Sequence, residues 1–140
     1  MIEIKRESCP KILYNFPTEG KLYNKPAVVK KLWDMQHGKC CYCESEIPKD
    51  GHGKEVEHYY PQAQSLYPHF RNDWNNLLLV CHSCNGKKSH KFPLDENGNP
   101  LLIDPSTLAQ TLNSILILRS IKITHGLVKS RRKETQNGVK

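Results

Sequence analysis

Two Cys-x-x-Cys pairs constrain this chain more than any other feature of its sequence. They are Cys40/Cys43 and Cys81/Cys84, in a chain of 140 residues. A Cys-x-x-Cys turn lets both sulfurs reach one ion about 2.3 Å away, and four thiolates on two such turns suit a closed tetrahedral zinc. Each pair alone would also fit a redox dithiol, which is the alternative interpretation. We therefore predict a structural zinc bound by all four cysteines.

The length and composition of the chain favour one small domain. Because only 37% of the 140 residues are hydrophobic, the core is modest and a structural metal would add stability. No stretch approaches the roughly eighteen apolar residues of a membrane span, and residues 1–6 lack the apolar core of a signal peptide. We expect a cytoplasmic protein with no membrane contact, whose cysteines stay reduced. Cys9 and Cys41, outside the pairs, are then plain thiols.

The positive charge is concentrated at the C-terminal end of the sequence. The net charge is +7, but residues 119–140 hold seven Lys and Arg against one Glu, whereas residues 1–118 hold fourteen basic residues against thirteen acidic ones. Zinc bound by four thiolates would add a local charge of about −2. The charge therefore allows a polyanionic partner without demonstrating one.

Hydrophobic periodicity and turn residues predict a short series of elements. Pro26 suits a first helical position and His37-Gly38 suits a helix end, so a helix is predicted between them, with Trp33 and Met35 in the core. The other predictions are an extended arm over residues 1–25, strands at 44–47 and 54–60, a buried strand or turn at 77–80, a helix from near Ser83, and a hairpin of residues 92–94 and 101–103.

A second set of polar residues stands between and just after the cysteine pairs. Glu57, His58, Asn76 and Asn85 supply a carboxylate, an imidazole and two carboxamides, which suit an open, oxygen-rich metal site with a base beside it. The alternatives are a solvated carboxylate, a surface imidazole or extra zinc ligand, and an asparagine that caps a helix. Neighbouring residues of a strand point to opposite sides, so a bend near Pro61 is required for Glu57 and His58 to act together.

Several of these elements, taken in order, resemble one known family. The segments are Cys40-x-x-Cys43, Val56-Glu57-His58, Trp74-x-Asn76-Leu77-Leu78-Leu79 and Cys81-x-x-Cys84-Asn85-x-x-Lys88. Together they resemble the HNH endonuclease family in its zinc-knuckle form. The opening residues 1–6 with Pro10, and the segments 91–94 and 101–105, resemble the HNH nuclease subunit of Septu-type and retron-associated anti-phage systems. The resemblance covers roughly residues 1–106.

The resemblance implies a fold and a set of residue roles. The fold is α+β, a small treble-clef-like ββα-metal domain with a four-cysteine zinc site, an N-terminal arm and helix, and a basic C-terminal tail. His58 would be the general base that takes a proton from water, Glu57 an acidic metal ligand and Asn85 a second ligand. Asn76 would hold the loop of the base through a hydrogen bond to the backbone. The catalytic ion would be magnesium or manganese.

The resemblance also implies partners. Nucleic acid would be cut, with DNA favoured and RNA an alternative, and an ABC-like or SMC-like ATPase would restrain and target the nuclease. Lys87, Lys88 and Lys91 are candidate phosphate contacts, although a basic helix face is usually only a solvated one. The rival from another class is a zinc-stabilised module that binds nucleic acid or protein without cleaving.

The last part of the chain departs from that branch. We expect an HNH domain over residues 1–106 and an extension over residues 107–140. After Ser106 the family's longer, more acidic continuation is not recognised. Residues 108–121 fit either a helix or a strand, and residues 129–140 fit a disordered basic tail. This departure places the ATPase-docking surface in question.

Overall fold

The computed structural model describes residues 4–15, 18–50, 52–62 and 67–107 of the chain. Contacts divide the chain into two units, Met1–Ser106 and Thr107–Lys140. Within the described ranges, every helix and strand lies in the first unit. The helix-or-strand and tail expectations for residues 108–140 lie outside the described residues.

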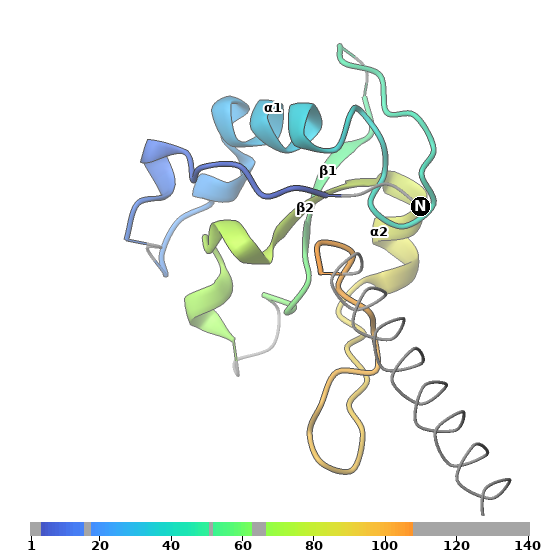
Figure 1. Cartoon of the computed structure of the whole chain (residues 1–140). Helices are drawn as coiled ribbons and strands as arrows, with labels where there is room; N and C mark the ends of the chain where they lie inside the picture. The colour runs from blue at the N-terminus through green and yellow to red at the C-terminus, as the bar shows by residue number, and fades with distance from the viewer. Residues whose placement is uncertain (1–3, 16–17, 51, 63–66, 108–140) are drawn as a thin grey trace, which may run out of the picture. The chain divides into compact units, whose positions relative to one another are not determined.

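Two antiparallel strands form the centre of the first unit (Figure 1). Strand β1 (Lys54–His58) pairs with β2 (Leu77–Cys81), so that Lys54 lies opposite Cys81 and His58 opposite Leu77. The four apolar residues at the start of β2 are all buried, which agrees with the buried strand predicted there. Helix α2 (His82–Lys88) follows β2 directly and packs on both strands. The α+β class with two strands and two helices is confirmed.

Helix α1 (Pro26–Met35) confirms the first predicted helix, with proline in the first turn. Gly38, just past its end, has φ +68°, and a Cβ there would lie 2.6 Å from the ring of Trp33. Only glycine avoids both the positive-φ strain and this clash. The side chain of the buried Gln36 hydrogen-bonds the edge of β2 that does not pair with β1. Its Nε2 donates to the Leu79 carbonyl at 2.9 Å, and its Oε1 accepts from the Leu79 amide at 2.7 Å. These two bonds fix α1 against the sheet.

The N-terminal arm lies on the domain, as predicted. It contains two short 3-10 helices, η1 (Lys11–Leu13) and η2 (Leu22–Asn24), and buries Ile4 in the core. The Arg6 guanidinium donates to the carbonyl oxygens of Trp74 at 2.9 Å and of Leu77 at 2.6 Å. The Trp74 indole N–H donates back to the Glu7 carbonyl at 2.8 Å. The arm therefore holds η4 (Trp74–Asn76), which leads into β2.

Three strand predictions were too long. The strand expected at 44–47 is a single bridge between Lys39 and Glu46, because the chain turns back through Glu44 at φ +61°. The hairpin expected from 92–94 and 101–103 is likewise one bridge between Leu94 and Pro100. The strand expected at 54–60 ends at His58, because the backbone amide of Tyr60 is bonded by a side chain, that of Asn76, at 2.7 Å.

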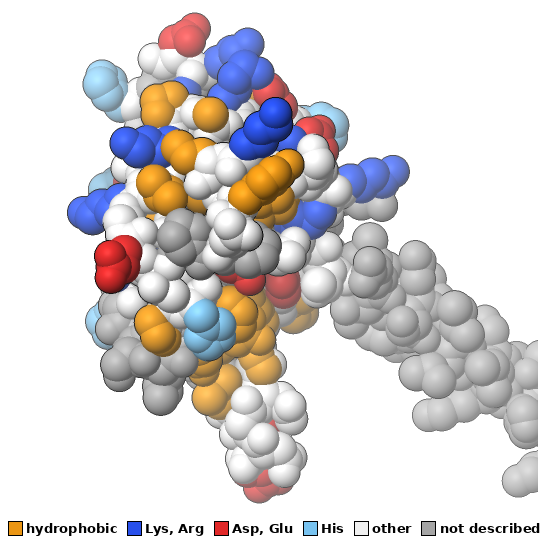
Figure 2. Space-filling view, turned by 90° about the vertical axis from the view of Figure 1, so that its left-hand side faces the viewer, with side chains coloured by type: hydrophobic (Ala, Val, Ile, Leu, Met, Phe, Trp, Pro, Cys, Tyr) orange, Lys and Arg blue, Asp and Glu red, His pale blue; other side chains and the backbone are white. Residues whose placement is uncertain are grey.

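The described surface carries no simple electrostatic signature. On the face drawn in Figure 2, Lys and Arg side chains are scattered among apolar and acidic ones. Among the described residues, no helix has the length and apolarity that crossing a membrane requires.

Candidate functional site

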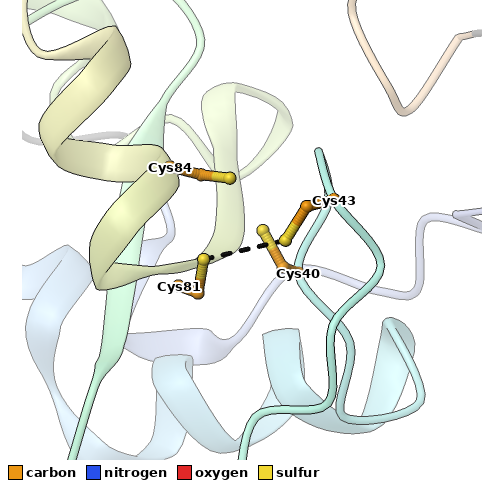
Figure 3. Close-up of side chains that lie close together, drawn as sticks. All are labelled: Cys40, Cys43, Cys81 and Cys84. Atoms are coloured by element: carbon orange, nitrogen blue, oxygen red, sulfur yellow. Dashed lines mark hydrogen bonds between the residues drawn. The ribbon is translucent and has the colours of Figure 1, made fainter.

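The four cysteines of the two pairs converge on one point (Figure 3). Their sulfurs all lie within 4.8 Å of one another, and Cys43 Sγ is 3.8 Å from Cys81 Sγ. Sulfurs bound tetrahedrally at about 2.3 Å from one ion stand about 3.8 Å apart. Cys40 and Cys43 come from the loop after α1, Cys81 ends β2 and Cys84 lies on α2. The sequence-predicted ligand set is therefore assembled with spacing that fits a tetrahedral metal.

The surroundings of the cluster favour the thiolate form of Cys40, and the closeness of the four sulfurs favours a bound cation. A hydrogen bond from the Cys41 thiol, together with backbone hydrogen bonds, lowers the pKa of Cys40 to about 3 despite its burial. Burial and neighbouring thiols raise the pKa of Cys84 to about 12. Four sulfurs this close repel one another once ionised, so a bound cation stabilises the group. Cys9 and Cys41 lie outside the cluster, as expected.

A cavity of about 370 Å³ opens beside β1 and α2. Glu57, His58 and Asn85 all line it, and so does Glu55. Three of the four residues predicted to act together therefore share one cavity, whereas Asn76 is not among its lining residues.

His58 occupies the last position of β1 and is buried. Its Nε2 lies 2.8 Å from the carbonyl oxygen of Arg71, and its ring meets the Tyr23 ring edge-on at 4.5 Å between centroids. Because a carbonyl can only accept, the proton of the neutral imidazole sits on Nε2 and the lone pair on Nδ1. Burial lowers the pKa of His58 to about 4. The ring is thus a neutral proton acceptor near pH 7.

Asn76 fastens the chain that follows His58. Its Oδ1 accepts from the Tyr60 amide at 2.7 Å, and its Nδ2 donates to the carbonyls of Tyr60 at 3.1 Å and Phe70 at 3.0 Å. Phe70 directly precedes Arg71, the residue that hydrogen-bonds the imidazole. Asn76 therefore joins both segments that fix the orientation of His58.

The Glu57 carboxylate is occupied by a buried ion pair. Its Oε1 accepts from the Tyr42 hydroxyl at 3.0 Å and pairs with the Lys88 ammonium, whose Nζ also donates to the His58 carbonyl at 2.9 Å. Burial raises the pKa of Glu57, and the hydrogen bond and charge of Lys88 only partly offset this. The Lys88 side chain is 8% exposed and is held in this ion pair, and its contact with phosphate stays a prediction. Lys87 and Lys91 are exposed and stay candidates.

Asn85 contacts Glu55 rather than Glu57. The Asn85 side-chain amide donates to Glu55 Oε2, and His82 Nδ1 lies 2.5 Å from Glu55 Oε1. Burial opposes ionisation of Glu55, but the hydrogen bonds from Asn85 and His82 outweigh it and lower its pKa. Sequence reasoning missed Glu55, although its place two residues before Glu57 puts both carboxylates on one side of β1.

Replacing Lys88 by methionine is expected to destabilise the protein by about 3 kcal/mol, because it leaves the Glu57 carboxylate buried without its cation. Adding Glu57→Gln should recover most of that loss, since the second change removes the uncompensated charge. Urea unfolding of both single variants and the double variant, with zinc present throughout, measures the coupling. If the double variant loses as much unfolding free energy as the two single variants together, the ion pair does not contribute to stability.

The pKa of His58 predicts that stability falls with acid. The folded state resists protonation until about pH 4, whereas the unfolded state takes up the proton near pH 6.5. Stability is therefore lost as pH falls from about 7 towards 4, by about 2 kcal/mol at pH 5. In a His58→Gln variant this contribution vanishes, while acid effects on the thiolates remain. Urea unfolding at pH 7 and pH 5 should show a smaller acid loss in the variant; equal losses would contradict the assignment.

Comparison with known proteins identifies the region that holds the site. A model described as HNH endonuclease matches residues 40–94, which include both cysteine pairs and the cavity. A Septu protein PtuB of Bacillus thuringiensis is 33% identical over 134 residues, covering 87% of this chain and 51% of the relative. A second, of Bacillus mycoides (strain KBAB4), is 38% identical over 98 residues, covering 60% of this chain and 32% of the relative.

A third similarity is confined to a smaller region. The CRISPR-associated endonuclease Cas9 of Staphylococcus aureus is 38% identical over 68 residues, which cover 45% of this chain and 6% of the relative. The chain spans about half the length of the first Septu relative and less of the second. A match over 87% of 140 residues must extend past residue 106, so the similarity is longer than the sequence motifs indicated.

Proposed function

Residues 40–94 of this chain belong to the HNH endonuclease family, and from that premise we propose that the protein hydrolyses phosphodiester bonds in nucleic acid. The observation that carries the proposal is the cavity that Glu57, His58 and Asn85 line together. A buried neutral imidazole supplies a base there, and the carboxylates and carboxamide supply oxygen donors for a hard cation.

In this proposal His58 accepts the proton of the attacking water through Nδ1, while its Nε2–H is held by the Arg71 carbonyl. Asn76 positions the ring by fastening the two segments beside it. Glu57 and Asn85 would hold magnesium or manganese, with Glu57 first leaving Lys88. When bound, such an ion supplies neutralisation of the phosphate charge and stabilisation of the leaving oxygen. Lys87 and Lys91 would contact phosphates outside the cavity.

We further propose that the four-cysteine cluster binds zinc and has a structural role. Four thiolate ligands leave no open position, which is typical of structural sites and not of catalytic ones. The cluster joins the loop after α1 to the junction of β2 and α2. Tyr42, which lies within the first cysteine pair, hydrogen-bonds Glu57. Zinc would therefore also fix one wall of the cavity.

The Septu relatives support a proposed role in anti-phage defence in the cytoplasm. In this role DNA is the favoured substrate, RNA is the alternative, and an ABC-like or SMC-like ATPase is the proposed partner. The similarity to the first relative continues past residue 106, so it includes part of residues 107–140.

Incubation of the protein with plasmid, single-stranded DNA and total RNA tests the activity. Cleavage is expected with magnesium or manganese and not with a chelator. A specific observation favours one rival, a zinc-stabilised binding module without catalysis: Lys88 already pairs with the Glu57 carboxylate, which occupies a group that the nuclease would need as a metal ligand. Binding without divalent-dependent cleavage of any of the three substrates, also with an ATPase partner added, would establish that rival.

A further inference from the structure

Arg6 reaches from the N-terminal arm to the backbone of η4 and of the residue after it. Its guanidinium donates to three main-chain carbonyl oxygens: that of Trp74 at 2.9 Å, that of Asn75 at 2.9 Å and that of Leu77 at 2.6 Å. These carbonyls stand immediately before and after Asn76. One side chain from a distant part of the sequence therefore fixes the backbone that carries Asn76.

We propose that Arg6 is a positioning residue for the base of the reaction, and that it acts through Asn76 on His58. The inference rests on the proposed function, in which His58 takes a proton from water. It extends the site beyond the part of the chain that the family model covers, because that match begins at residue 40. The N-terminal arm then contributes to the chemical step as well as to the fold.

A short series of hydrogen bonds connects Arg6 to the imidazole. The guanidinium holds the backbone at η4, and from there the Asn76 side chain donates to the Phe70 carbonyl at 3.0 Å. The next carbonyl along the chain, that of Arg71, holds Nε2 of His58 at 2.8 Å. A shift of the backbone at Asn76 therefore moves the carbonyl that orients the ring.

The shape of the guanidinium matters because three carbonyls have to be met at once. A guanidinium offers five N–H donors in one plane, whereas a lysine ammonium is a compact point charge. Burial lowers the pKa of Arg6, and the charges of Asp104 and Asp73 partly offset this effect, so the group stays a cation. A lysine at this position would leave at least one of the three carbonyls without its donor.

A second cation ties the same arm to α1 instead of to η4. Lys31 donates to the Ser8 hydroxyl at 3.0 Å. Its removal loosens the arm while the three bonds from Arg6 remain. Lys31→Met is therefore the matched control, because it separates an effect of the guanidinium from an effect of the arm as a whole.

NMR of the full chain with labelled histidine, loaded with zinc, tests the inference without substrate. In wild type the His58 ring should show one tautomer, with its proton on Nε2 where the Arg71 carbonyl accepts it. We expect Arg6→Lys to broaden the Nε2–H signal and to bring in the Nδ1–H tautomer, because the ring is no longer held in one orientation. A loss of stability alone leaves the spectrum of the folded molecules unchanged. Lys31→Met should give the wild-type spectrum.

Cleavage kinetics supply a second readout. Arg6→Lys is expected to lower kcat about 10- to 100-fold with KM within about threefold, because a misplaced base slows the chemical step and leaves substrate binding intact. Adding Arg6→Lys to Asn76→Ala should cause no further loss, because the effect of Arg6 passes through that side chain. Circular dichroism shows whether each variant is folded. Arg6→Gln replaces Arg6→Lys if the latter does not fold, since glutamine leaves no charge in the buried position.

Three results would overturn the inference. They are a wild-type His58 spectrum in the Arg6 variants, the same spectral change in Lys31→Met, and losses of kcat that add up in the double variant of Arg6 and Asn76. The expected spectra without cleavage of any substrate would leave Arg6 as the residue that orients His58 and refute the nuclease proposal. Cleavage by wild type together with full activity of Arg6→Lys would do the reverse.

Discussion

His58→Ala is expected to lower the rate of phosphodiester cleavage about 10²- to 10⁴-fold, the contribution typical of a positioned general base. The two groups that hold the ring, the Tyr23 ring and the Arg71 carbonyl, are poor bases and do not replace it in this variant. The cysteine cluster and the donors around Asn85 do not depend on the imidazole. Single-turnover cleavage at saturating divalent ion measures the loss.

Two controls accompany this variant. His69→Ala removes an exposed histidine of η3 (Pro68–Phe70) whose ring lies tilted against that of Phe70, and this variant should cleave as wild type does. Substrate binding by His58→Ala, measured without turnover, should stay within about threefold of wild type. Cleavage by His58→Ala within tenfold of wild type would refute the assignment of the base. Parallel loss of binding and cleavage would show that His58 acts on the structure alone.

Removal of the metal from the cysteine cluster is expected to unfold residues 40–94. Structural zinc contributes about 10–16 kcal/mol of apparent binding free energy in small domains, as much as the whole net stability of a typical domain. The core here is small, and the cluster ties the loop after α1 to the start of α2. Far-UV circular dichroism and thermal melting with a strong zinc chelator measure the loss, and added zinc should restore the fold.

Single substitutions refine this prediction. Cys81→Ser removes one of the four clustered sulfurs and should abolish tight zinc binding together with the cooperative thermal transition. Cys9→Ser is the matched control, because Cys9 lies outside the cluster and its thiol donates to the Pro10 carbonyl at 3.5 Å. A chelated protein that melts cooperatively at the wild-type temperature would show that the cluster is dispensable for the fold.

The local sequence was sufficient to predict the features that depend only on neighbouring residues. Two cysteines three residues apart define a knuckle wherever the turn lies, so the ligand set of the cluster was predictable in full. The bounds of α1 followed from Pro26 and Gly38, because proline and glycine restrict the backbone through their own geometry. The cavity residues Glu57, His58 and Asn85 were predictable as a set, although their roles stay proposals.

The partners of the charged and polar side chains were decided by the tertiary structure. From the sequence, Lys88 is expected to be an exposed residue of a helix. In the fold it is buried and pairs with Glu57, which lies thirty-one positions earlier in the chain. Asn85 could have met either glutamate of β1, and only the placement of α2 selects Glu55. Spacing along a chain fixes which side chains share a face, whereas burial and pairing depend on elements that arrive from elsewhere in the sequence. The residue types of the site were thus set by the sequence, and which of them are free to bind was set by packing.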